Sequence, residues 1–231
     1  MSVSFVVPFY NEEKNLYQVY KTIKKLVKKC KIGKYEIILV NDGSVDNSKK
    51  IALNIKKKDK NVKFFNHPRN RGMGEAIKSG LLVSTKKYVM WVMGDNEHPY
   101  YGLKPLFKEY EKYDIVIPYV KNPEARSLVR RIISAFYTLF LNIIFFKKMK
   151  YYDGCSLYKR KIIQKSVRKI NNFSMTFVSE MLIRSLKFTK NFKIVGYYLN
   201  SHKKTGKSDA LKISNVFFGI MKIIVYRLFG I

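Results

Sequence analysis

The sequence predicts an α/β fold in which helices cover both faces of a mostly parallel sheet. Apolar runs of strand length alternate with segments of helical periodicity over the first 120 residues. The chain of 231 residues is 47% hydrophobic and 15% aromatic, which is enough for a sizeable core and too apolar for disorder. One uncharged run, residues 88–94, leads directly into Asp95 and Glu97 before Pro99. Ligands bind beyond the carboxyl ends of central strands in such folds, so we expect a site there.

The elements of the first half follow one another in regular alternation. Apolar runs bounded by turn residues indicate strands, and apolar side chains recurring every three to four residues, with lysines opposite, indicate helices. The expected strands are residues 2–8, 35–40, 62–65, 88–94 and 114–120. The expected helices are residues 16–27, 46–58, 72–84 and 103–110.

The composition of the sequence changes after residue 120. Residues 132–146 carry no charge, and Ser134, Thr138 and Asn142 recur every four residues on one stripe. A helix of this length would measure about 22 Å, short of the ~30 Å hydrocarbon core of a bilayer. We therefore expect a helix that lies on the membrane or dips into it rather than a full span. The alternative is a buried core helix.

The remaining segments are expected to complete the fold and add a second membrane contact. Residues 158–188 are expected to be helical, 192–199 a strand and 201–209 a basic loop. Residues 212–231 form an amphipathic pattern of lysine, arginine and large apolar side chains, suited to the interface of an anionic bilayer. Alternatives for this last helix are docking on the core or binding a partner.

Charge and cysteine content limit the class of protein. There are 46 basic against 16 acidic residues, a net charge of +30, which attracts nucleic acid, anionic lipid or phosphorylated ligands. Cys30 and Cys155 fit neither a disulfide framework nor a zinc site, so we expect a reducing compartment. Residues 2–8 have the pattern of a core strand rather than of a signal peptide.

Four polar motifs follow predicted strands. They are Pro8-Phe9-Tyr10-Asn11-Glu12, Asn41-Asp42-Gly43-Ser44-Val45-Asp46, Asn70-Arg71-Gly72-Met73-Gly74 and Asp95-Asn96-Glu97-His98-Pro99. In this order and spacing they resemble the family 2 glycosyltransferases, and in particular the polyprenyl-phosphate glycosyltransferases typified by dolichol-phosphate mannose synthase. The resemblance covers roughly residues 2–210.

The resemblance implies a GT-A-type, Rossmann-like fold divided into functional parts. Residues 1–120 would bind the nucleotide sugar, residues 121–210 the acceptor, and residues 211–231 would form a C-terminal amphipathic helix. The donor, a UDP- or GDP-sugar, would be bound by Pro8, Tyr10, Glu12, Asp42, Gly72, Gly74 and Lys203. In this scheme Tyr10 stacks on the base, Glu12 accepts from a ribose hydroxyl and Asp42 accepts from a base N–H. Gly72 and Gly74 let the backbone approach the nucleotide, and Lys203 lies in a loop that closes over the diphosphate.

The acidic motif implies a divalent cation, Mg²⁺ or Mn²⁺. Asp95 and Glu97 could hold it together with the donor phosphates, which gives Asp95 a catalytic role. The sequence departs from the family at two positions, because Met93 replaces a metal-binding aspartate and Met73 replaces a common lysine. These departures raise the alternative of a catalytically weakened membrane scaffold.

The acceptor is expected to be a polyprenyl phosphate at the cytoplasmic face of a membrane. Arg126, Arg130 and Arg131 would bind its phosphate, and Asp153 would orient the acceptor or the sugar during inverting transfer. A phosphate is already anionic, so no strong general base is required. Expected partners are the nucleotide sugar, the lipid and an anionic membrane surface, and a membrane-protein partner is left open.

Two other functions compete with this one. A family 2 transferase acting on a glycan hydroxyl would need a general base, with Asp153 or Glu180 as candidates. A basic nucleic-acid-binding protein would fit the net charge but has no use for the fifteen uncharged residues 132–146. We therefore expect no nucleic acid.

Overall fold

A single mixed sheet forms the centre of the protein. The computed structural model describes residues 2–171 and 176–200. Seven strands of this part pair in the order β3-β2-β1-β4-β6-β5-β7. They are β1 (Ser2–Phe9), β2 (Lys34–Asp42), β3 (Val62–His67), β4 (Tyr88–Trp91), β5 (Ile115–Val120), β6 (Leu157–Lys159) and β7 (Phe192–Tyr197). Only β6 among them runs antiparallel, to both β4 and β5, so the predicted mostly parallel sheet is confirmed.

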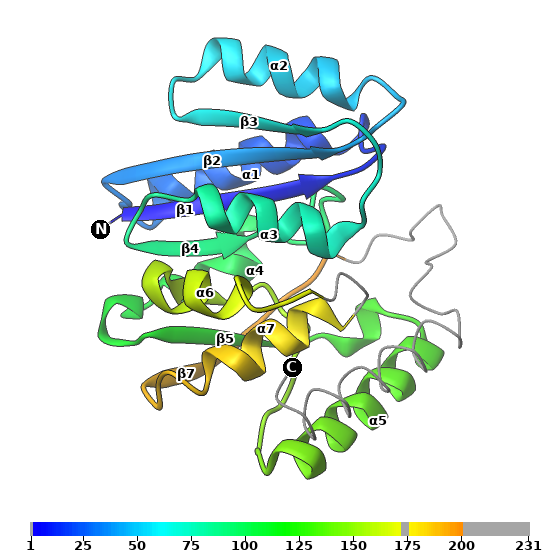
Figure 1. Cartoon of the computed structure of the whole chain (residues 1–231), viewed down its shortest axis with the longest axis vertical. Coiled ribbons are helices and arrows are strands. Elements are labelled where there is room, and N and C mark those ends of the chain that lie inside the picture. The colour runs from blue at the N-terminus through cyan, green and yellow to red at the C-terminus, as the bar shows by residue number, and fades with distance from the viewer. Residues whose placement is uncertain (1, 172–175, 201–231) are drawn as a thin grey trace.

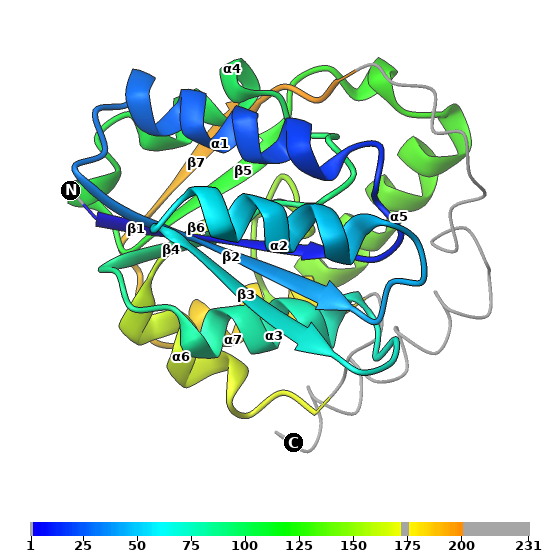
Figure 2. The same ribbon diagram turned by 90° about the horizontal axis from the view of Figure 1, so that it is seen from above.

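Helices cover both faces of the sheet, as predicted (Figures 1 and 2). One layer contains α1 (Leu16–Lys29), α2 (Ser48–Lys58) and the short α4 (Tyr100–Leu103). The opposite layer contains α3 (Met73–Val83), α6 (Arg160–Val167) and α7 (Phe177–Ser185). The packing is close: a Cβ added at Gly80 of α3 would lie 2.2 Å from Val6 Cγ1 of β1.

Two predicted helical segments were wrong in detail. The expected helix at 103–110 is instead α4 followed by the 3-10 turns Lys104–Phe107 and Tyr110–Lys112. Pro105 supplies no amide hydrogen there, and Glu109 adopts a left-handed φ of 60°. The segment 158–188 includes strand β6 at its start, where Leu157 and Tyr158 are buried between β4 and β5. Three residues are too few to show a strand period in the sequence.

Helix α5 (Leu128–Phe145) is the long uncharged helix. It is 18 residues long, so it measures about 27 Å rather than the expected 22 Å. The side chain of Ser127 caps it by accepting from the amide of Arg130. Leu141 is its only buried residue, and the core-helix alternative is therefore wrong for the described residues. By length and composition it is the one helix in residues 2–171 and 176–200 that could cross a membrane.

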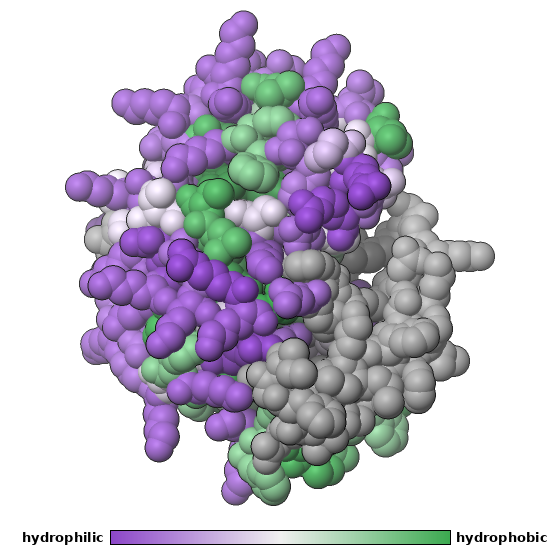
Figure 3. All heavy atoms as spheres, viewed as in Figure 1, coloured by the Kyte–Doolittle hydropathy of each residue, from purple (hydrophilic) through white to green (hydrophobic). Residues whose placement is uncertain are grey.

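The exposed side of α5 is apolar. Large apolar side chains open to solvent include Val129, Ile132, Phe136, Leu139 and Ile143, with Phe136 70% exposed. Figure 3 shows apolar side chains at the lower edge of the molecule, where α5 lies in Figure 1, and a second apolar strip on the otherwise hydrophilic upper part. The predicted loop at 201–209, with Lys203, and the predicted helix at 211–231 lie outside the described residues.

Candidate active site

The predicted donor motifs meet at one edge of the sheet. Strands β1, β2 and β4 are parallel, and their carboxyl ends lie on the right in Figure 1. Asp42 is the last residue of β2, and Asp95 follows β4 after a short extended segment. That segment continues alongside β1, because the amides of Val92 and Gly94 donate to the carbonyls of Val6 and Pro8. The parallel sheet therefore places Asp42 and Asp95 at the same edge.

The first two motifs are joined to each other. Asn11, in a left-handed conformation with φ of 55°, accepts from the amide of Val45, and its own amide donates to Ser44 Oγ. The amide of Glu12 donates to Ser48 Oγ at 2.7 Å. The neighbouring Tyr10 is 44% exposed, so its ring is open to a ligand.

Asp42 holds the glycine loop in place. Its two carboxylate oxygens accept from the amides of Arg71 and Gly72 at 3.0 and 2.9 Å. His67 Nδ1 lies 2.8 Å from the same carboxylate, and His67 Nε2 lies 3.0 Å from Ser79 Oγ. Gly72 needs its φ of 93°, which other residues rarely adopt. Asp42 is buried, so in this arrangement it supports the loop that precedes α3, and Gly74 is the second residue of that helix.

Sequence reasoning missed His67. It is the last residue of β3, and the register pairs it directly with Asp42 on β2. The signal available in the sequence was only that a polar residue ends a predicted strand. Its partner becomes apparent only when β2 and β3 are paired.

Asp95 and Glu97 have different surroundings. Asp95 Oδ1 accepts from the amide of Glu97 at 3.0 Å, around Asn96 with its φ of 58°. Glu97 Oε1 instead lies 3.4 Å from Arg126 Nη2 and 3.6 Å from Arg130 Nη1. A cation at Glu97 would be repelled by two guanidinium groups, so Glu97 does not fit as a metal ligand in this arrangement.

A cation at this edge would therefore depend on few protein ligands. No three acidic, histidine or cysteine side chains cluster as a metal site within residues 2–171 and 176–200. Asp95 fits a site of the Mg²⁺ type, in which one carboxylate suffices when substrate phosphates supply further oxygens.

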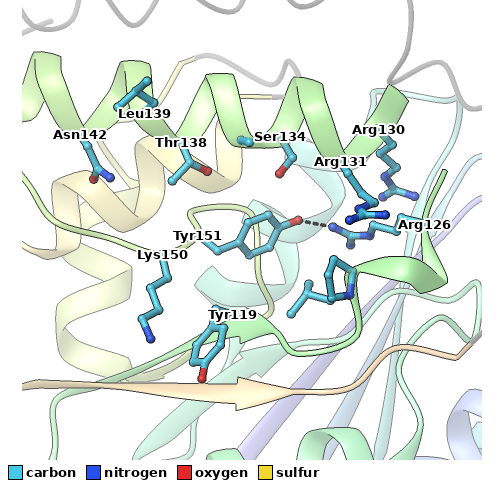
Figure 4. A pocket seen from close by; sticks show the side chains of 13 residues that line it. Tyr119, Arg126, Arg130, Arg131, Ser134, Thr138, Leu139, Asn142, Lys150 and Tyr151 are labelled. Atoms are coloured by element: carbon cyan, nitrogen blue, oxygen red, sulfur yellow. Dashed lines mark hydrogen bonds between the residues drawn. The ribbon is translucent and has the colours of Figure 1, made fainter. Parts of the chain in front are cut away.

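The three predicted acceptor arginines line one pocket. The pocket has a volume of about 400 Å³ and lies between α5 and the end of β5 (Figure 4). Arg126 Nη1 donates to Tyr151 Oη at 2.8 Å, and the guanidinium lies over the Tyr151 ring. The pocket is lined by Tyr119, Val120, Pro123, Arg126, Arg130, Arg131, Ser134, Ala135, Thr138, Leu139, Asn142, Lys150 and Tyr151.

The polar stripe of α5 forms one wall of this pocket, while the apolar side of the helix stays exposed. Ser134 and Thr138 point into it (Figure 4). Asn142 fixes the wall by bonding both the amide and the carbonyl of Met149, at 2.9 Å each. Tyr151, which sequence reasoning missed, lies in the middle of the pocket, although its place beside Asp153 in the sequence was a signal.

The two candidate bases differ in their environments. Asp153 has a buried oxygen without a hydrogen-bond donor among the described residues. Burial raises the pKa of Asp153 to about 6, and the nearby Arg126 and Arg130 partly oppose that increase. Glu180 is held in a buried ion pair with Arg184 at 2.7 Å. Asp153 is therefore the carboxyl group next to the arginine pocket that can change protonation near neutral pH.

Asp153→Asn should stabilise the protein above pH 6. The folded-state pKa of Asp153 lies above its ordinary value, so ionisation of the carboxyl opposes folding. The asparagine variant should gain about 1–3 kcal/mol above pH 6. The gain should decline as the pH falls from 6. It should vanish below about pH 4, where Asp153 is protonated in both the folded and the unfolded protein. Denaturant unfolding of both proteins from pH 3.5 to 8 measures this, and a pH-independent difference would contradict it.

Residues 4–167 match glycosyl transferase family 2, and the chain belongs to that family. The family match confirms the predicted family and class of enzyme, and the fold is the predicted GT-A fold. The polyprenyl-phosphate branch is supported by a sequence relative, a dolichyl-phosphate beta-glucosyltransferase of Trichomonas vaginalis. The two are 38% identical over 97 residues, which is 40% of this chain and 30% of that protein. The chain also spans only 42% of the Bacillus subtilis protein CsbB, with 34% identity over 141 residues.

Solved structures share the fold. TarS of S. aureus in complex with UDP-GlcNAc superimposes with a TM-score of 0.69 and 18% identity, over 98% of this chain and 66% of that chain. Glucosyl-3-phosphoglycerate synthase from Mycobacterium tuberculosis, in complex with Mn²⁺, UDP and glucosyl-3-phosphoglycerate, gives a TM-score of 0.63 and 17% identity. That match covers 98% of this chain and 79% of the synthase.

Proposed function

We propose that the protein transfers a sugar from a UDP- or GDP-sugar to a polyprenyl phosphate at the cytoplasmic face of a membrane, with inversion at the anomeric carbon. The observation that carries the proposal is the position of the arginine pocket. It opens beneath a helix whose exposed side is apolar. Glu97 connects the pocket to the edge of the sheet that carries Asp42 and Asp95, which we call the donor edge. A polyprenyl phosphate needs both a cationic pocket for its phosphate and an apolar surface for its lipid chain.

The donor would lie at the carboxyl ends of β1, β2 and β4. Tyr10 would stack on the base and Glu12 would accept from the ribose, while Asp42 keeps Gly72 and Gly74 in place against the phosphates. Lys203 would close over the diphosphate. The UDP and UDP-GlcNAc bound to the two structural neighbours support a nucleotide sugar as donor.

A divalent cation would be held by Asp95 and the donor diphosphate. Bound there, it would neutralise negative charge on the leaving group. The Mn²⁺ in the glucosyl-3-phosphoglycerate synthase supports this assignment.

The acceptor phosphate would bind to Arg126, Arg130 and Arg131. Arginine's planar fork matches phosphate oxygens, and the acceptor arrives deprotonated, so Asp153 would position the acceptor or sugar rather than remove a proton. The raised pKa of Asp153 favours an alternative function, in which the acceptor is a glycan hydroxyl and Asp153 removes its proton as the general base.

One extraction experiment tests the acceptor class. The protein is incubated with labelled UDP- and GDP-sugars, Mg²⁺ or Mn²⁺ and a polyprenyl phosphate, and the products are extracted into organic solvent. We expect label in the lipid phase as a mild-acid-labile glycosyl phosphate. Label found only on soluble or polymeric glycan, with every polyprenyl phosphate tested, would refute the proposed acceptor.

Membrane binding should depend on the exposed side of α5. Phe136→Ser with Ile143→Ser removes two apolar side chains that are 70% and 65% exposed and two turns apart. Each substitution removes about 1.5–3 kcal/mol of the free energy gained when the side chain is buried in the membrane interface. Sedimentation with anionic vesicles should therefore fall at least tenfold. The matched control is Leu53→Ser on α2, also exposed, which should sediment normally. Equal sedimentation of all three proteins would place the membrane contact elsewhere.

A further inference from the structure

Glu97 connects the donor edge of the sheet to the acceptor pocket. It lies two residues after Asp95, yet its side chain points to Arg126 and to Arg130 at the start of α5. The side chains of Glu97 and Arg126 are only 13% and 10% exposed. These charges lie in a shielded region, where electrostatic interactions are stronger than in water.

The pairing leaves the arginines short of acceptors. A single oxygen, Oε1, serves both guanidinium groups, at distances beyond the usual 2.7–3.2 Å of a good hydrogen bond. Arg126 Nε is buried and has no acceptor in the part of the chain that the structure describes. Arg131 adds a third guanidinium to the same pocket. The pocket therefore has an excess of donors, which a tetrahedral phosphate with several oxygens would satisfy.

We propose that Glu97 is an internal counter-ion of the acceptor pocket, which an incoming phosphate displaces. In the empty pocket Glu97 holds Arg126 and Arg130 in position, and in the complex the phosphate takes its place. Glu97 is thus a positioning residue for the acceptor rather than a ligand of the cation. The inference rests on the proposed function, because it assumes that the arginine pocket receives an anionic phosphate.

The physical reason for an exchange is charge balance. A nine-tenths buried guanidinium without a counter-charge is strongly destabilising, and in the empty pocket Glu97 pairs directly with Arg126, with Asp153 as a second carboxyl group nearby. A phosphate bound beside Glu97 would meet a like charge at short range, which weakens binding. Displacement removes this repulsion and keeps Arg126 neutralised throughout.

Glu97 is also joined to Asp95 through its main chain. The backbone amide of Glu97 donates to Asp95 Oδ1, whereas its side chain pairs with the arginines. Displacement of the side chain therefore leaves the hydrogen bond to the carboxylate that would hold the cation in place.

The test measures phosphate binding in Glu97→Gln with EDTA present, so that no divalent cation contributes. Wild type, Glu97→Gln and Glu124→Gln are titrated with inorganic phosphate and with a water-soluble ten-carbon prenyl phosphate, using calorimetry and ³¹P NMR. Glu124 is the matched control, because it is exposed, lies two residues from Arg126 and is absent from the pocket lining. Melting temperatures are recorded with and without each phosphate.

We expect Glu97→Gln to bind both phosphates about tenfold more tightly than wild type, which corresponds to ~1.4 kcal/mol. Without phosphate its melting temperature should fall by about 2–4 °C, and phosphate should restore it. Glu124→Gln should match wild type in both measurements. Unchanged or weaker binding in Glu97→Gln, while wild type still binds phosphate, would overturn the role of Glu97 and leave the proposed function standing. No phosphate binding by any of the three proteins would overturn both.

Discussion

Replacing Arg130 and Arg131 together by alanine should reduce transfer to polyprenyl phosphate by about 10²–10⁴-fold in kcat/KM. Both side chains line the arginine pocket, and hydrogen bonds to charged groups contribute about 1.5–3 kcal/mol each. Both are more exposed than Arg126, so the fold should survive the change. Initial rates over a range of polyprenyl phosphate concentrations, at saturating donor, measure the effect.

The matched control is Arg168→Ala with Lys169→Ala. It removes two positive charges from an exposed segment after α6 that does not line the pocket. Transfer should stay within about twofold of wild type, because isolated surface charges contribute little. Equal losses in the two double variants would show that general attraction to the anionic membrane, and not the pocket, explains the effect of the arginines.

Asp95→Asn should lower the rate of transfer by roughly 10²–10³-fold at any Mg²⁺ or Mn²⁺ concentration, since it removes the carboxylate expected to hold the cation against the leaving diphosphate. Isothermal titration with Mn²⁺ and UDP should show weaker cation binding. Glu97→Gln should keep the wild-type dependence of rate on cation concentration, because Glu97 pairs with arginine. The reverse pattern, in which Glu97→Gln needs much more cation and Asp95→Asn does not, would move the cation to Glu97.

The sequence was sufficient to place the predicted donor motifs at one edge of the sheet. Uncharged runs ending in polar motifs predicted parallel strands, and parallel strands bring their carboxyl ends together wherever the helices between them lie. The positions of Asp42 and Asp95 therefore followed from local patterns. Strand β6 could not be found in this way, because its three residues owe their extended conformation to β4 and β5 on either side.

The arginine pocket was only partly predictable. The family resemblance implied a phosphate site at Arg126, Arg130 and Arg131, and the stripe of Ser134, Thr138 and Asn142 indicated a distinct polar side of the helix. The ion pairs of Glu97 with Arg126 and Arg130 join segments about thirty residues apart, and no local pattern encodes such a contact. Tyr151 was missed because its partner Arg126 lies 25 residues away, and its position two residues before Asp153 does not reveal that contact.

The antiparallel strand β6 also affects the order in which the protein can form during synthesis. Strands β1 to β4 are built from neighbouring segments, and their pairings close before residue 92. Strand β5 has no partner in the sheet until residues 157–159 and 192–197 have been made. Helix α5 lies between these two stages in the chain, so it leaves the ribosome while the second half of the sheet is still open. Because β5 supplies Tyr119 and Val120 to the arginine pocket, the apolar side of α5 is synthesised before the strands that fix that pocket in the sheet.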